Sequence, residues 1–193
     1  VNKEIAMRKS FLWILVCLSC VVAKVDAAEV ADMFSNLPIV KDVSVSPDGA
    51  HMVGVFNVDG KVVVMTSAFG SKETTPIVSL KNPADRIESV DWANNKRLLV
   101  TASIPNAVSG SVFRIRVTYA VNLDGSDMLI IENNSASKKN EATWIRRYTS
   151  DSIVNTLADD DDHVIVSSYD ERDNGYALYK VDINNSRFEK IES

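Results

Sequence analysis

The densest group of ionisable side chains in this sequence is the run of four aspartates from Asp159 to Asp162. Calcium binds several carboxylate oxygens at once, so the run is a candidate ligand set for that cation. It also stands between two β-type segments, at the place where Pro47-Asp48-Gly49 stands earlier in the chain. We therefore expect a solvated turn between strands and predict no metal site.

The two histidines, His51 and His163, each begin a β-type segment directly after a turn. Imidazole is the side chain that most readily ligates metals or transfers protons near neutral pH. The two residues occupy matching places in different repeats, so a shared metal site would need a third ligand from elsewhere. We expect both to be exposed side chains beside turns.

Two arginines, Arg114 and Arg116, alternate with apolar residues along one segment. Because side chains alternate across a β-strand, the two guanidinium groups are predicted to share one face. A solvent-exposed face is the simpler interpretation, and a role in orienting a peptide is the alternative. The large aromatic residues are expected to pack between repeats rather than bind a ligand, namely Trp92, Trp144, Tyr148, Tyr169 and Tyr179.

The elements that would position these residues are short, valine-rich segments separated by strong turn signals such as Asp59-Gly60 and Asn174-Gly175. They fall into three sets of four predicted antiparallel strands. The predicted strands are 40–46, 51–57, 61–67 and 75–80; then 86–92, 96–103, 112–122 and 128–132; then 152–157, 163–169, 176–182 and 187–191.

The three sets align at their first turns, which places His51 beside Arg97 and His163 at spacings of 46 and then 66 residues. We attribute the unequal spacing to a loop at 104–111 and a polar linker at 133–150. Insertions in loops cost little free energy, so the spacing is compatible with a repeat.

Four-stranded units repeated at this length are typical of β-propeller blades, which are small twisted sheets packed face to face. The alternative is a single β-sandwich, which the regular sets of four disfavour. The predicted fold is therefore all-β: a partial β-propeller in residues 28–193, with blades at about 40–80, 86–132 and 151–192. Since closed rings have about four to eight blades, we expect this chain to be part of a longer ring.

Residues 1–27 are predicted to be upstream residues and a secretory signal peptide. Met7-Arg8-Lys9 forms a positive head, an apolar run covers 11–23, and Val25-Asp26-Ala27 precedes a plausible cleavage site. The run is shorter than the roughly 20 residues that span a bilayer, so we predict no stable membrane span. The mature protein is expected to be periplasmic or extracellular.

Both cysteines, Cys17 and Cys20, lie in that apolar run, so cleavage after Ala27 would leave no disulfide. Attachment of a lipid to Cys20 is the weaker alternative, because Cys17 stands where a large aliphatic residue is usual. The whole chain has a formal charge of −5, and without residues 1–27 this becomes −7. With no cluster of lysine and arginine to neutralise phosphates, nucleic-acid binding is excluded.

The stretch SVSPDGAHM at 44–52 resembles the strand–turn–strand of TolB-like propellers and of the propeller domains of prolyl-oligopeptidase-family serine peptidases. LADDDDHVIV at 157–166, YALYKVDINN at 176–185 and YAVNLDGSDM at 119–128 are similar to blades of exported bacterial peptidases of that family. The Pro47-Asp48-Gly49 part of this resemblance builds a tight corner and carries out no chemistry.

The resemblance implies a non-catalytic propeller that gates substrate access, or supplies an interface, for a C-terminal α/β-hydrolase domain. In that family the nucleophile lies on a G-x-S-x-G elbow, and this pentapeptide does not occur in the 193 residues. We therefore assign no catalytic residue, cofactor or metal ligand. The expected partners are the missing hydrolase domain, a partner protein or peptides; the alternative is a TolB-like interaction module with no peptidase partner.

Overall fold

The computed structural model describes residues 40–108, 110–133, 151–170 and 172–192 of the chain. The predicted signal peptide, both cysteines, Trp144, Tyr148 and most of the predicted linker lie outside these residues. Residues Pro38–Ser193 form one compact unit, to which the description below refers. None of the residues described in this unit forms a helix long and apolar enough to cross a membrane.

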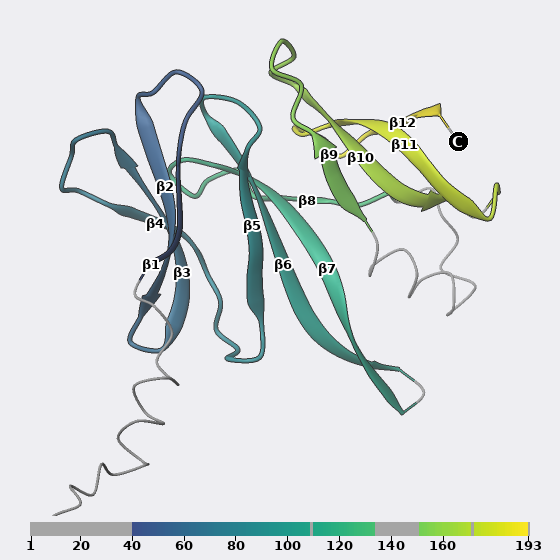
Figure 1. Ribbon diagram of the computed structural model, residues 1–193, viewed down its shortest axis with the longest axis horizontal. Helices are drawn as coiled ribbons and strands as arrows, with labels where there is room; N and C mark the ends of the chain where they lie inside the picture. The colour runs from purple at the N-terminus through teal and green to yellow at the C-terminus, as the bar shows by residue number, and fades with distance from the viewer. Residues whose placement is uncertain (1–39, 109, 134–150, 171, 193) are drawn as a thin grey trace, which may run out of the picture. The chain divides into compact units, whose positions relative to one another are not determined.

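The described chain folds into three antiparallel sheets of four consecutive strands each, which confirms the predicted sets (Figure 1). Blade 1 contains β1 (Val40–Val45), β2 (His51–Val58), β3 (Lys61–Ala68) and β4 (Thr75–Ser79). Blade 2 contains β5 (Arg86–Trp92), β6 (Arg97–Val108), β7 (Ser111–Asn122) and β8 (Leu129–Ile131). Blade 3 contains β9 (Ser152–Asn155), β10 (His163–Asp170), β11 (Gly175–Asp182) and β12 (Phe188–Glu192). The all-β partial propeller predicted from the sequence is therefore the observed fold.

The turns form where the residue types require them. Asp59 and Gly60 connect β2 to β3 with φ values of 49° and 74°. Two positive φ values in a two-residue connection give a type I′ turn, whose twist matches that of the flanking strands. In the first corner of blade 1, the Asp48 carboxylate accepts the backbone N–H of Ala50 at 3.0 Å.

The predicted loop at 104–111 is wrong, because β6 and β7 continue through this region as a paired hairpin (Figure 1). Pairing extends from Arg97↔Asn122 to Val108↔Ser111. The β5 partner of β6 ends earlier, at the pair Arg86↔Ser103. Pro105 therefore lies where β6 has a single neighbouring strand, a position at which proline is tolerated.

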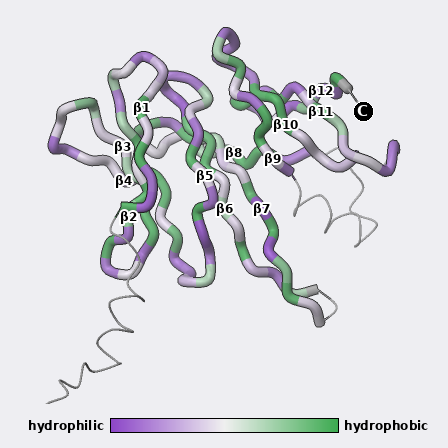
Figure 2. Tube along the Cα trace, viewed as in Figure 1, coloured by the Kyte–Doolittle hydropathy of each residue, from purple (hydrophilic) through white to green (hydrophobic). Residues whose placement is uncertain are grey.

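Two apolar cores join the three sheets, and Leu98 and Leu99 of β6 contribute to different ones. The core between blades 1 and 2 contains Leu98 together with Val53, Val55, Val64, Ile77, Ile87, Val100, Ala102 and Val121. The core between blades 2 and 3 contains Leu99 with Ala93, Ala120, Ile131, Val164, Val166, Ala177, Tyr179, Val181 and Ile183. Figure 2 shows hydrophobic segments along the central strands of each sheet. Blade 2 thus contributes apolar side chains from both of its faces, as expected of a propeller blade between two neighbours.

Hydrogen bonds also cross between the sheets. Trp92 Nε1 donates to Ser44 Oγ at 3.0 Å, and the Trp92 side chain packs against the core between blades 1 and 2. Tyr179 packs in the second core. Both residues confirm the expected packing of aromatic side chains between repeats, whereas Tyr169 pairs with Tyr176 of its own sheet, with ring centroids 5.9 Å apart.

Candidate functional site

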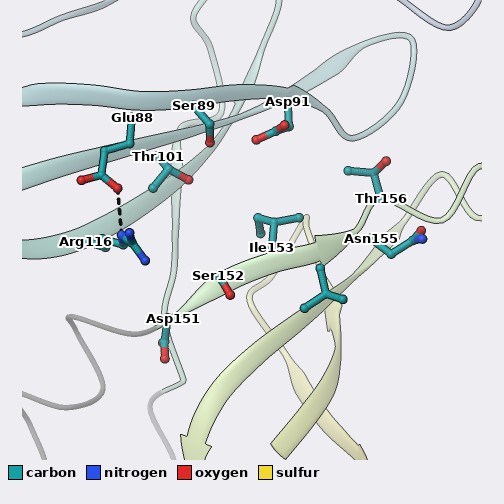
Figure 3. A pocket seen from close by; sticks show the side chains of 11 residues that line it. Glu88, Ser89, Asp91, Thr101, Arg116, Asp151, Ser152, Ile153, Asn155 and Thr156 are labelled. Carbon is teal, nitrogen blue, oxygen red and sulfur yellow. Dashed lines mark hydrogen bonds and ion pairs between the residues drawn. The ribbon is translucent and has the colours of Figure 1, made fainter. Parts of the chain in front are cut away.

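A pocket of about 650 Å³ lies between blades 2 and 3 (Figure 3). One wall comes from β5, β6 and β7, and the opposite wall comes from β9 and the residues beside it. The lining residues are Glu88, Ser89, Asp91, Thr101, Arg116, Asp151, Ser152, Ile153, Val154, Asn155 and Thr156. We call this pocket the wedge.

The wedge opens where blade 2 turns polar on the face that it presents to blade 3. The strand registers place Thr101, Thr118 and Arg116 of blade 2 where blade 1 has Val55, Val64 and Val62. In blade 1 these valines pack in or against the core shared with blade 2. In blade 2, the two threonine hydroxyl groups bond one another at 3.0 Å instead. Apolar packing is therefore confined to one end of the interface between blades 2 and 3.

An ion pair forms part of the blade 2 wall: Arg116 Nε donates to Glu88 Oε2 at 2.8 Å (Figure 3). Glu88 projects from the irregularity between Ile87 and Ser89, where the register of β5 and β6 shifts. Burial alone would raise the pKa of Glu88, but hydrogen bonds from Ser103 and Arg116 and the nearby positive charges outweigh it and lower that pKa. Glu88 is therefore a carboxylate at neutral pH.

Arg114 and Arg116 share one face of β7, as the alternation predicted. The N–H groups of Arg114, however, form hydrogen bonds with other residues of the chain. Its Nε donates to Ser103 Oγ at 2.9 Å, and its Nη2 donates to the carbonyl groups of Ser103 and Ala84 at 2.6 and 2.8 Å. Arg116 is exposed, and Arg114 is half-buried. Of the two, only Arg116 lines the wedge.

The opposite wall of the wedge is the first strand of blade 3. Ile153 packs partly into the core between blades 2 and 3, while Val154 is exposed. Ser152, Asn155 and Thr156 add hydroxyl and amide groups (Figure 3). The wall therefore offers both apolar contact and hydrogen-bonding groups to a molecule that enters.

The four aspartates lie in the connection between β9 and β10, as expected for a turn. The Asp160 carboxylate bonds Lys180 Nζ and His163 Nδ1, both at 2.8 Å. These two hydrogen bonds, Lys180 first, hold the pKa of Asp160 well below its usual range. The Asp161 carbonyl accepts Asn94 Nδ2 of blade 2 at 2.7 Å. The run thus forms the connection between β9 and β10 and contacts blade 2 through the Asp161 carbonyl.

The prediction that both histidines are exposed is wrong, because each is half-buried. His163 is drawn against its sheet by the Asp160 carboxylate, and its side chain is 33% exposed. His51 begins β2 and His163 begins β10, so they belong to different blades, as predicted. Among the residues that the structure describes, no group of three His, Cys, Asp or Glu side chains is close enough to hold a metal ion.

Sequence reasoning did not identify the wedge. The alignment of the repeats could have indicated it, because two threonines and an arginine of blade 2 replace three valines of blade 1 at positions that face the following blade. The residues of β9 carried no comparable signal, since their role depends on which strand lies opposite.

Similar folds occur among solved structures. An acylaminoacyl peptidase in complex with Z-Gly-Gly-Phe-chloromethyl ketone is 13% identical with a TM-score of 0.54, covering 81% of this chain and 25% of that one. The Pyrococcus horikoshii acylaminoacyl peptidase is 13% identical with a TM-score of 0.52, covering 80% and 25%. A putative conserved lipoprotein from Clostridium novyi NT is 11% identical with a TM-score of 0.41, covering 82% and 89%. The chain thus spans about a quarter of the length of these peptidases, and at such identities the likeness shows the fold alone.

No curated protein matches the sequence. A family model described as the lipoprotein LpqB β-propeller domain matches residues 18–174, which is most of the chain. This match agrees with the three sheets and the two cores between them. The chain therefore belongs to the lipoprotein LpqB β-propeller domain family.

Proposed function

We propose that this chain is a non-catalytic propeller portion of an exported cell-envelope protein and that the wedge binds or admits peptide segments. The observation that carries this proposal is the polar opening between blades 2 and 3, in contrast to the apolar core between blades 1 and 2. Membership of a lipoprotein propeller family supports the envelope location.

In its most specific form, the proposal makes the chain the substrate-gating or interface portion of an exported serine peptidase with an α/β-hydrolase domain. The resemblance of SVSPDGAHM at 44–52 to such peptidases supports this form, and the fold likeness to acylaminoacyl peptidases is compatible with it. β5 and β9 are the first strands of their sheets, and first strands of blades face the central channel of a propeller. A ligand in the wedge would therefore lie on the route through the ring.

A TolB-like interaction module without a peptidase partner is the second candidate. The family match favours it, because the family is described from a lipoprotein and not from a peptidase. Lipid attachment at Cys20, outside the described residues, would fit this candidate.

The two candidates differ in active-serine chemistry. The native protein can be isolated from the cell envelope with an antibody raised against residues 40–133, treated with a fluorophosphonate probe and weighed by intact mass spectrometry. A labelled polypeptide supports the peptidase portion, and an unlabelled one supports the interaction module. Heat-denatured protein provides the control for labelling that does not depend on an active site.

The role of the wedge can be tested separately with Val154→Trp, which places an indole in the opening, against Val112→Trp on the distal β6–β7 hairpin as the matched exposed control. We expect Val154→Trp to weaken peptide binding or turnover at least tenfold and Val112→Trp to leave it unchanged. Equal behaviour of the two variants would contradict the proposed role of the wedge.

A further inference from the structure

The wall of the wedge that blade 3 provides is continuous along the chain. Every residue from Asp151 to Thr156 lines the pocket. Side chains of a strand alternate between the two faces of its sheet, so a wall made by one face would include only every second residue. The pocket therefore follows the edge of β9, where the backbone of successive residues forms part of the wall.

This edge of β9 has no neighbouring strand among the residues that the structure describes. β9 lies at the end of the strand order in its sheet and pairs only with β10. Val154, on the same strand, is 54% exposed. An unpaired edge presents N–H and C=O groups that an extended chain can bind by adding one more strand to the sheet.

Blade 2 faces this edge with a carboxylate from its own first strand. Asp91 of β5 pairs with Leu99 of β6, and Leu99 packs in the core between blades 2 and 3. Residues paired across two strands share a face, so Asp91 is also directed toward blade 3. Figure 3 shows Asp91 across the pocket from Ile153 of β9. Because side chains alternate, a strand added to β9 would direct every second side chain toward blade 2 and Asp91.

The charges of the pocket favour a positively charged side chain at that position. The described lining contains the carboxylates of Glu88, Asp91 and Asp151 and one guanidinium group, that of Arg116. Arg116 Nε is bonded to Glu88 at 2.8 Å, so these two charges offset each other. No described residue forms a hydrogen bond or ion pair with the Asp91 carboxylate, which is half-buried. A lysine or arginine of a bound peptide would supply the opposite charge.

We propose that the wedge binds an extended peptide as an additional strand on the free edge of β9, with a lysine or arginine side chain directed toward Asp91. This inference rests on the proposed function of the wedge in binding peptides, and it specifies the mode of binding and the class of peptide. Hydrogen bonds to the peptide backbone would provide affinity for many sequences, and Asp91 would provide the preference for basic side chains.

The mode of binding can be tested with the native protein isolated from the cell envelope and a fluorescent pentapeptide in which valine alternates with lysine. Two derivatives carry N-methyl groups, one at the valines only and the other at the lysines only. Because alternate N–H groups of a strand point to opposite edges, only one derivative blocks pairing with β9. Fluorescence anisotropy should show that this derivative binds about tenfold more weakly than the unmethylated peptide, and that the other changes the affinity by less than about threefold.

The class of peptide can be tested with glutamate in place of lysine in the same peptide, which should weaken binding. Asp91→Asn, introduced into the native gene, should reduce the preference for lysine by about three- to fivefold, because the substitution removes the charge and keeps the shape. Asp59→Asn is the matched control, since Asp59 is an exposed aspartate in the turn between β2 and β3, outside the wedge. It should leave the preference unchanged.

The failure of this inference can be distinguished from the failure of the proposed function. If Val154→Trp abolishes peptide binding but the two N-methylated derivatives bind equally, strand addition is overturned and the peptide-binding function stands. Equal binding of the lysine and glutamate peptides would overturn the preference for basic side chains. A lysine peptide that does not bind, or that binds equally to Val154→Trp, would contradict both the inference and the proposed function of the wedge.

Discussion

At the scale of single residues, Asp170 of blade 3 is a buried ionisable group, 9% exposed. Its carboxylate accepts Lys190 Nζ at 2.9 Å, the Tyr179 hydroxyl at 2.8 Å and the N–H of Arg172 at 2.8 Å. These hydrogen bonds, led by that of Lys190, hold the pKa of Asp170 well below its usual range. Burial and the Asp170 carboxylate raise the pKa of Tyr179 to about 12, so its hydroxyl keeps its proton.

We expect Asp170→Asn to lower the free energy of unfolding by about 1–3 kcal/mol at pH 7, because a buried carboxylate with charged and neutral donors is replaced by an amide. The pKa of Asp170 is lower in the folded state, so its contribution is fully present above the unfolded value of about 3.9 and is lost as the pH falls below it. Urea unfolding at pH 7 and pH 3 should show the difference between the two proteins shrinking at pH 3.

Asp173→Asn provides the control, since Asp173 also pairs with Lys190 but its side chain is 43% exposed. Exposed ion pairs contribute about 0–1 kcal/mol, so its effect should be smaller. A larger loss for Asp173→Asn than for Asp170→Asn would show that burial does not set the strength of this network.

At the scale of elements, Arg97 links blade 2 to blade 3 through a side chain that is 6% exposed. Its guanidinium group donates to the Ile183 carbonyl of blade 3 at 3.2 Å. It also donates to Asn122 Oδ1 at 2.7 Å and to the Asp127 carbonyl at 2.9 Å. Burial lowers the pKa of Arg97, and the charge of Asp127 opposes that shift. One side chain thus satisfies acceptors in two connections after the third strands.

Replacing Arg97 by Met should cost about 2–4 kcal/mol of stability, because the apolar side chain leaves three partly buried acceptors without this donor. Lys96→Met, at the exposed neighbouring position, should change stability by less than about 0.5 kcal/mol. Thermal or denaturant unfolding of the two variants gives the comparison. Similar stabilities would mean that water replaces the guanidinium group at no cost.

The elements were largely predictable from the sequence because turn chemistry is local. Asp59-Gly60 and Pro47-Asp48-Gly49 favour corners by themselves, and valine-rich runs lie between such signals. The continuation of β6 and β7 was missed because Pro105 and Gly110 resemble loop residues, and only the early end of β5 makes proline acceptable there. The wedge was missed for a related reason: its lining combines β5, β6 and β7 with β9, which are brought together by packing between sheets.

At the scale of the whole molecule, stability is divided between two cores that share blade 2. Leu98 and Leu99 are adjacent in the sequence and both fully buried. Leu98 packs in the core between blades 1 and 2, whereas Leu99 packs in the core between blades 2 and 3. Each sheet is built from consecutive strands, so each blade can open without unpairing the others.

Leu98→Ala and Leu99→Ala should each cost about 2–5 kcal/mol, the usual range for a buried leucine. Amide exchange should separate them: Leu98→Ala should accelerate exchange mainly in β2 and β3, and Leu99→Ala mainly in β10 and β11. The two variants change the same residue type on the same strand, so each is the control for the other. Uniform acceleration in both variants would show that the three blades open as one unit.

The burial of β6 on both faces has a consequence for how its register is specified. A strand with one solvent-exposed face is destabilised when its register shifts by one residue, because its apolar side chains then become exposed to water. Sliding β6 by one residue would exchange Leu98 and Leu99 between two apolar cores, so these two leucines give little discrimination between registers. Arg97 provides discrimination between registers, because the same shift would place its charged group in the interior beside blade 1, away from Asn122, Asp127 and Ile183. A residue at the margin of the sheet thereby determines the alignment of its central strands.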